Sequence, residues 1–164
     1  MSHLQYYAYE GQGERALEKY SYNQAVRVGD RIECSGQGKA PRFLLTSPEH
    51  QLSNYKGISG GWNNQTGKFE TEINAQIDLA FANVERCLLD AGGAGWSQVY
   101  RVNSYHVPIN DEALAAMIRN FRKYMPNHKP IWTTIGVSRL GEDDMRVEIE
   151  VVAHVPSASE SAQA

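Results

Sequence analysis

The sequence predicts a two-layer α+β domain, in which two amphipathic helices pack on one face of a β-sheet. Three observations predict this class: short segments that alternate apolar and polar residues, two longer segments with apolar residues at helical spacing, and the order hairpin, helix, strand, helix, strand, strand. The chain of 164 residues suits one domain. We assign residues 1–155 to it and expect residues 156–164 to form a disordered tail. Several strands are apolar on both faces, so we expect another subunit to cover the second face of the sheet.

The N-terminal part predicts a strand followed by a hairpin. Residues 4–9 favour a first strand, and the glycine-rich segment that follows favours a turn. Two alternating runs, residues 23–28 and 31–35, flank Gly29-Asp30, a pair typical of hairpin turns. The second run ends in SGQG (35–38). These glycines either simply end the strand or let the backbone approach a ligand closely.

Two helices are predicted downstream. The first spans residues 71–91, with Thr71 as its cap and Gly92-Gly93 at its end, and the second opens at Asn110 or Asp111 and ends before Pro126. Residues 96–107 alternate between them and predict a strand. The apolar stripes of the two helices are Ile73, Ile77, Ala80, Phe81, Val84, Cys87 and Leu88, and Leu114, Met117, Ile118, Phe121 and Met125.

Two closing strands are predicted, joined by a polar turn. The first covers residues 131–137 and follows a proline, and the second alternates Val147, Ile149 and Val151 with charged residues. The charged face that carries Glu148 has two interpretations. It is a solvated face, which is the ordinary case, or it is one wall of a site.

Composition excludes several classes of function. A net charge of -3 gives no support for nucleic-acid binding, and no apolar run is long enough to span a membrane. The N-terminus lacks the character of a signal or transit peptide, so we expect a cytoplasmic protein. Cys34 and Cys87 have no metal-ligand spacing and are interpreted as buried thiols. Because no metal or cofactor motif is present, none is expected.

A set of polar residues at strand ends suits a small-molecule cleft with one carboxylate able to orient a water molecule. On pattern alone His106 is either a site group or an ordinary buried histidine. The set comprises Tyr22, Ser35, Asn103 or His106, and Glu148.

Five blocks in this order resemble the RidA/YjgF family of enamine and imine deaminases. They are YNQAVRVGDRIECSGQ, QIDLAFANVERCLLDAG, VNSYHV, HKPIWTTIGVSRL and VEIEVVA, which lie between Tyr22 and Ala153. The resemblance implies a chorismate-mutase-like fold and a homotrimer with a central barrel and three clefts between subunits. It assigns Tyr22 and Ser35 to the cleft and implies that Glu148 positions the water that attacks an imine carbon.

One departure from the family pattern concerns substrate binding. Active deaminases of the family carry an arginine two residues after the proline that opens the penultimate strand, where it clamps the carboxylate of a 2-imino acid. Here Trp132 stands two residues after Pro130. We therefore expect negligible activity on 2-aminoacrylate or 2-iminobutanoate. Arg139 lies too far along, and Arg146, expected on the face of Glu148, is a conceivable substitute clamp.

We expect the cleft to be retained with a changed specificity. Trp132, Tyr22, Tyr105 and His106 would make it aromatic, suited to a larger, less anionic or aromatic ligand. The alternative for Trp132 is packing at the subunit interface. Two functions stay open: a hydrolytic deaminase for an enamine or imine other than the usual 2-imino acids, and a trimer that binds a small metabolite without turnover. RNA cleavage is not supported, because the chain is acidic.

Residues 39–61 fit none of the predicted elements and interrupt the resemblance. One interpretation is an inserted surface loop that leaves the strand just after Ser35 and covers or obstructs the cleft. The other is a retained intron translated in frame. Joining Gly38 to Gly61 gives the continuous SGQGGW, and a Gly-Lys pair at the start of the insert can be encoded GGTAAG, which contains a donor-like GTAAG.

Overall fold

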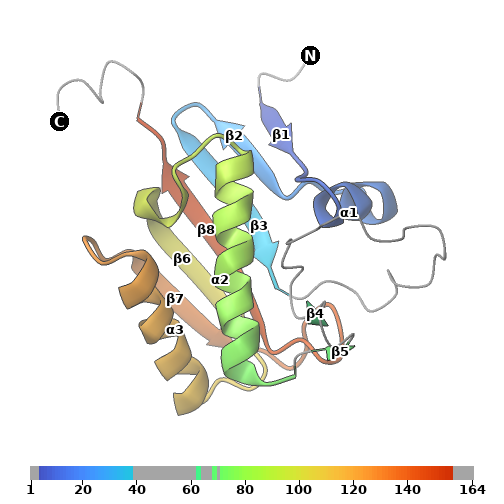
Figure 1. Cartoon of the computed structure of the whole chain (residues 1–164), viewed down its shortest axis with the longest axis vertical. Helices are drawn as coiled ribbons and strands as arrows, with labels where there is room; N and C mark the ends of the chain where they lie inside the picture. The colour runs from blue at the N-terminus through green and yellow to red at the C-terminus, as the bar shows by residue number, and fades with distance from the viewer. Residues whose placement is uncertain (1–3, 39–61, 64–67, 70, 157–164) are drawn as a thin grey trace.

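The computed structural model describes residues 4–38, 62–63, 68–69 and 71–156, so the predictions for residues 39–61 and 157–164 lie outside it. A six-stranded sheet and three α-helices make up the domain (Figure 1), which confirms the predicted α+β class. The helices and strands are β1 (Gln5–Tyr7), α1 (Gln12–Tyr20), β2 (Ala25–Val28), β3 (Arg31–Gln37), β4 (Trp62–Asn63), β5 (Lys68–Phe69), α2 (Ile73–Asp90), β6 (Val99–His106), α3 (Asp111–Tyr124), β7 (Ile131–Gly136) and β8 (Val147–His154), with a 3-10 turn at Gly95–Gln98.

The sheet has the order β1-β2-β3-β8-β6-β7. The hairpin of β2 and β3 turns at Gly29, whose φ of 61° is the left-handed conformation that glycine adopts without strain. Both predicted closing strands are present, but β7 and β8 are not neighbours in the sheet. β6 lies between them, parallel to β7 and antiparallel to β8. A run of alternating residues indicates a strand but carries no information about which strand pairs with it. The pattern alone therefore does not place β6 between β7 and β8.

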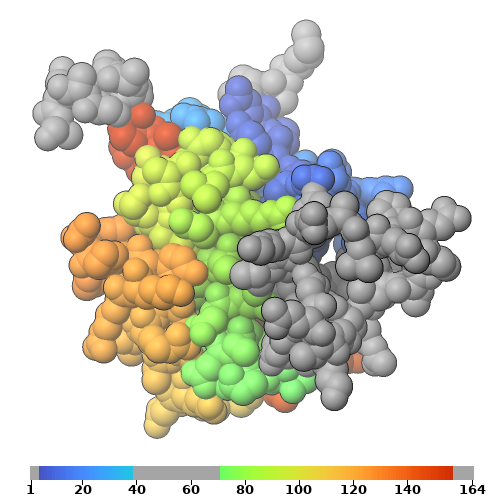
Figure 2. All heavy atoms as spheres, in the orientation of Figure 1, coloured from blue at the N-terminus to red at the C-terminus, as the bar shows by residue number. Residues whose placement is uncertain are grey.

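The predicted helices α2 and α3 pack side by side on one face of the sheet (Figure 1). Their atoms cover most of that face in the space-filling view (Figure 2). The core between helices and sheet is aromatic at its centre, where Phe81 stacks on Trp96 with ring centres 4.4 Å apart and meets Phe121 edge-on. The Trp96 indole donates to the Phe81 carbonyl at 2.9 Å, so the one polar group of this large side chain is satisfied.

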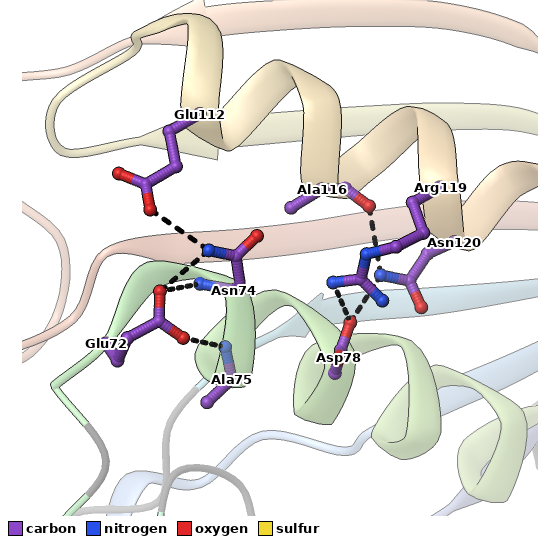
Figure 3. Close-up of polar contacts among 8 residues, drawn as sticks. All are labelled: Glu72, Asn74, Ala75, Asp78, Glu112, Ala116, Arg119 and Asn120. Carbon is purple, nitrogen blue, oxygen red and sulfur yellow. Dashed lines mark hydrogen bonds and ion pairs between the residues drawn. The ribbon is translucent and has the colours of Figure 1, made fainter.

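Polar contacts join the outer surfaces of α2 and α3 (Figure 3). At the start of α2, the Asn74 amide donates to Glu112 on α3 at 3.0 Å. About one turn further along α2, Asp78 pairs with Arg119 at 2.7 Å and accepts from the buried Asn120 at 2.6 Å. These contacts fix the two helices against each other above the apolar core.

Helix α1 was not predicted, because two glycines made its segment resemble a turn. Gly11 is the N-cap, with φ 87°, and its backbone N–H donates to the Glu14 carboxylate at 3.1 Å. Gly13 is buried, and a Cβ there would lie 2.8 Å from the backbone carbon of Ala8. The glycines therefore start the helix and allow its close packing. A hydrogen bond of 2.7 Å from Arg86 to the Glu10 carbonyl attaches this region to α2.

Both cysteines are buried free thiols, as predicted. A hydrogen bond with Cys34, and then burial, raise the pKa of Cys87 above its ordinary value. No helix within the described parts of the chain combines the length and the apolar character needed to cross a membrane.

The N-cap of α2 is Glu72 and not Thr71. The Glu72 carboxylate accepts from the backbone N–H groups of Asn74 and Ala75, both at 2.8 Å, which satisfies two donors at the start of the helix. The hydrogen bond from the Asn74 backbone holds the pKa of Glu72 below its ordinary value of 4.5.

Replacing the cap should therefore destabilise the protein. Glu72→Ala is expected to lower the free energy of unfolding by about 1 kcal/mol at pH 7. The matched variant Thr71→Ala should change it by less than about 0.5 kcal/mol. Because the pKa of Glu72 is lowered by folding, its contribution is present above pH 4.5 and is lost as the pH falls through the lowered value. Urea denaturation between pH 3 and 7 measures both effects, and equal losses in the two variants would contradict the assignment.

Candidate functional site

A cavity of about 350 Å³ lies between α1, the end of β3 and the start of β8. It is open to the surface and has both polar and apolar walls, and its volume is at the lower end of the range for small-molecule sites. It contains three of the residues predicted for the cleft, Tyr22, Ser35 and Glu148. The other lining residues are Gln12, Arg15, Ala16, Lys19, Tyr20, Gln24, Gly36, Gln37, Gly38, Gly141, Glu142 and Met145.

The side chain of Glu148 lies directly over the backbone of Gly36. A Cβ at Gly36 would meet the Glu148 carboxylate and would be 2.6 Å from its Cγ. The register of β3 against β8 shifts between Cys34 and Gln37, where three steps on β3 oppose two on β8. This β-bulge carries Ser35 and Gly36 out of the regular ladder. The glycines of the SGQG segment therefore do more than end a strand: Gly36 provides the space that the carboxylate occupies.

The carboxylate of Glu148 holds a proton more readily than that of an exposed glutamate. Burial, and then the nearby Glu150, raise the pKa of Glu148 above its ordinary value of 4.5. No group among the described residues donates a hydrogen bond to its carboxylate. Both oxygens are thus open to a water molecule or a ligand in the cavity.

Ser35 is held by a buried polar network behind the cavity. Its hydroxyl donates to the Gln24 carbonyl at 3.1 Å and accepts from the Gln37 amide at 3.3 Å. The same Gln37 nitrogen donates to the Gln24 side chain at 3.0 Å, and Gln37 in turn accepts from the Tyr9 hydroxyl at 3.3 Å. Burial raises the pKa of Tyr9 above its ordinary value of 10.0, so the Tyr9 hydroxyl is neutral and can donate. The Gln24 side-chain nitrogen has no acceptor among the described residues.

Tyr105 lies beside the cavity residues, on the sheet face that the helices leave open. It is paired with Glu148 in the register of β6 and β8, and its hydroxyl donates to Glu150 at 3.3 Å. Asn103 donates to the other oxygen of Glu150 at 3.2 Å. Arg146 does not line the cavity, and its guanidinium donates to the Val107 carbonyl at 3.3 Å. Within the chain, Glu150 and Arg146 therefore form hydrogen bonds that join neighbouring parts of the fold.

Trp132 and His106 lie on the opposite face of the sheet, under the helices. The Trp132 indole donates to the Ser104 hydroxyl at 2.9 Å and meets the ring of Phe121 edge-on. Nε2 of His106 is 2.9 Å from the same hydroxyl, and burial lowers the pKa of this histidine. A single chain therefore does not combine Trp132, Tyr105, His106 and Tyr22 into one aromatic wall. Residues one apart on a strand face opposite ways, which separates Tyr105 from His106.

Sequence reasoning missed the contribution of α1. Arg15 and Lys19 are one helical turn apart and therefore share a face, and both line the cavity. The Lys19 ammonium lies 4.9 Å from the centre of the Tyr20 ring. The signal that was available is the apolar spacing of Ala16 and Tyr20 on that same face, which the neighbouring glycines obscured.

The fold and the cavity define a small α+β protein with a candidate site for a small molecule. The family model described as endoribonuclease L-PSP matches residues 14–155. The chain belongs to this family, whose members include the RidA/YjgF proteins, and this confirms the resemblance noted in the sequence.

Solved structures agree on the fold. Rv2704 of Mycobacterium tuberculosis, described as a member of the YjgF/YER057c/UK114 family, is 18% identical with a TM-score of 0.63, over 93% of this chain and 99% of its own. Protein YJGH is 23% identical with a TM-score of 0.64, over 93% and 95% of the two chains. TdcF of E. coli, solved with bound serine, is 20% identical with a TM-score of 0.60, over 82% and 88%.

Filling the space at Gly36 should displace Glu148. Gly36→Ala is expected to lower the free energy of unfolding by about 1–3 kcal/mol, because the new methyl group and the carboxylate cannot occupy one position. Gly141→Ala is the matched control in the same cavity, since its Cβ would meet only Met145 Sδ at 3.8 Å. It should change stability by less than about 0.5 kcal/mol. Urea denaturation compares the two, and similar values for both would contradict the placement of Glu148.

Proposed function

We propose that the protein is a hydrolytic deaminase for a reactive enamine or imine other than the usual 2-imino acids. The observation that carries this proposal is the position of Glu148 at a cavity that also contains Ser35 and Tyr22. Its carboxylate has a raised pKa and no hydrogen-bond donor among the described residues. A carboxylate in that state can orient a water molecule and accept its proton. Membership of the RidA/YjgF family supports the same reaction class.

The reaction consumes one water molecule and releases ammonia. The water oxygen bonds to the imine carbon while Glu148 accepts a water proton. The proton then passes from Glu148 to the nitrogen, which gives a carbinolamine. The hydroxyl proton of this intermediate moves to the nitrogen as the C–N bond breaks, so that ammonia leaves and a ketone remains. Ser35 and Tyr22 supply hydroxyl groups that can orient the substrate. An enamine first becomes the imine by taking a proton on carbon.

The functional unit in this proposal is a homotrimer with clefts between subunits. β7 exposes apolar side chains on the face away from the helices, where Ile131 is 62% and Ile135 45% accessible. Exposed apolar side chains on an uncovered sheet face favour association with another subunit. Glu148 and Glu150 are on strand positions of this same open face, so a neighbouring subunit would complete the wall of the cleft.

A binding module without turnover is the second candidate. It is favoured by Trp132, which stands in place of the carboxylate-clamping arginine and packs against Phe121 and Ser104 within the subunit. Loss of that clamp would impair binding of the usual substrates while leaving a cavity for a metabolite.

Substitution of Glu148 separates the two candidates. Imines are generated in the assay by a flavin amine oxidase acting on arylalkylamines, and 2-iminobutanoate by threonine dehydratase, with ammonia release followed in time. Wild type is expected to accelerate hydrolysis of at least one arylalkyl imine, and Glu148→Gln to lower that rate about 100-fold or more. Acceleration of 2-iminobutanoate hydrolysis should be negligible, and a rate well above background there would contradict the proposal.

The pH dependence gives a second measurement of the same role. The rate should increase with pH as Glu148 loses its proton. Because the pKa of Glu148 is raised, this rising limb of the pH–rate profile should lie above pH 4.5. Glu150→Gln removes a neighbouring negative charge and should move this limb to lower pH. Glu142→Gln, also in the cavity, is the control and should leave it in place. Binding of a metabolite with no turnover of any imine in wild type or Glu148→Gln would favour the binding module.

The oligomer can be tested by mass. Light scattering of the purified protein is expected to give three times the chain mass of 18.4 kDa. Ile135→Lys places a charge on the exposed apolar face of β7 and should shift the mass towards one chain. Ile118→Lys, an equally exposed position on α3, is the control and should keep the mass of wild type. A monomeric wild-type protein would overturn the trimer.

A further inference from the structure

We infer that α1 supplies the anion-binding wall of the cavity, so that the substrate carries a carboxylate or phosphate group at a distance from its imine carbon. The inference names the substrate class of the reaction proposed above and rests on that proposal for the role of Glu148. It rests independently on the arrangement of charge in the cavity.

The cavity has two chemically different walls. Helix α1 contributes the basic residues Arg15 and Lys19 to the lining. The acidic residues Glu142 and Glu148 come from the segment that leads into β8 and from β8 itself. A ligand with an anion at one end and an electrophilic carbon at the other matches both walls in one orientation. The reverse orientation would place its anion against Glu148.

Arg15 is the arginine suited to this role. No oxygen among the described residues pairs with its guanidinium, and the planar fork of an arginine binds carboxylate or phosphate through two parallel hydrogen bonds. Arg31, Arg101 and Arg122 do not line the cavity, and five other arginines are already engaged. Arg27 donates to Gly29, Arg86 to Glu10 and Arg146 to Val107, while Arg119 pairs with Asp78 and Arg139 with Asp143.

Contacts with Ala8, Gln24 and Arg86 fix the position of α1 beside the cavity. Gly13 packs against the backbone of Ala8 and the side chain of Gln24, and Gln24 itself lines the cavity. Arg86 on α2 holds the Glu10 carbonyl just before the helix. A cation held on a fixed helix loses less freedom when it binds an anion than one on a loop.

This arrangement changes the expectation drawn from Trp132. The family clamp would bind a carboxylate attached directly to the imine carbon, on the strand two residues after Pro130. Here that position packs under α3, and the positive charge of the cavity comes from α1. The ligand therefore stays anionic, and what changes is the distance between its anion and the carbon that reacts.

Stable ketones that resemble products test the inference by binding alone. The probes are 5-oxohexanoate, 4-oxopentyl phosphate and the neutral 5-oxohexanamide, and ligand-observed NMR titrations give their dissociation constants. Wild type should bind at least one anionic probe about tenfold or more tightly than the amide. Arg15→Gln should remove most of that preference, and Arg15→Lys, which keeps the charge without the fork, should retain part of it. The preferred probe distinguishes carboxylate from phosphate.

Two control variants keep the result specific. Arg122→Gln removes an equal charge from an exposed position on α3 and should leave all affinities unchanged. Glu148→Gln should bind the anionic probes at least as tightly as wild type, because it removes a negative charge from the cavity. Circular dichroism and thermal melts establish that each variant folds. Equal binding of acid, phosphate and amide by wild type, or an unchanged preference in Arg15→Gln, would overturn the inference.

Different results would contradict the deaminase and the anion-binding wall. An Arg15-dependent preference for anions without turnover of any imine would overturn the deaminase and keep the anion-binding wall. Turnover of an imine that carries a distant carboxylate or phosphate, at a rate insensitive to Arg15→Gln, would keep the deaminase and overturn the wall.

Discussion

The close approach of the Glu148 carboxylate to the backbone of Gly36 is the constraint on which the site depends. β3 and β8 are neighbours in the middle of the sheet. A residue with a Cβ at position 36 would occupy the space of the Glu148 carboxylate. The bulge between Cys34 and Gln37 removes Ser35 and Gly36 from the ladder, and the missing Cβ of Gly36 leaves space for the carboxylate. A carboxylate placed there is partly withdrawn from water, and so its pKa rises.

The same bulge organises the elements around the cavity. After the extra residue, Gln37 faces inward again and is buried, where its amide is shared between Gln24 and Ser35 and its oxygen accepts from Tyr9. Tyr9 directly precedes the segment that starts α1. The position of α1 beside the cavity is therefore coupled through a buried hydrogen-bond network to β3, whose Gly36 lies under the Glu148 side chain. Such networks are costly to break because the freed groups are buried.

The sequence predicted those parts of the fold that depend on local pattern. The hairpin, α2, α3 and the alternation of β6 and β8 follow from periodicity and turn residues, and each was found close to its predicted bounds. Pairing between distant strands was beyond that reasoning, which is why β6 was not expected between β7 and β8. Helix α1 was missed for a different reason, since Gly11 and Gly13 weaken a helical pattern while serving its cap and its packing.

For the site, the sequence and the family resemblance selected Tyr22, Ser35 and Glu148, and the structure brings these three into one cavity. They could be selected because each stands in a recognisable block of the chain. Trp132 and His106 were grouped with them because a residue list does not show which way a side chain faces. Both lie under the helices and meet at Ser104.

The position of positive charge decides what a cavity of this kind accepts. An arginine on the penultimate strand would select molecules in which the acid group is attached to the reacting carbon. A tryptophan there gives no charge, and it is satisfied by Ser104 and Phe121 inside the subunit. Arg15 and Lys19 of α1 line the same cavity as Glu148 of β8. With the anion-binding wall inferred above, the family fold and Glu148 are kept, and the spacing between the anion and the reacting carbon is set by α1.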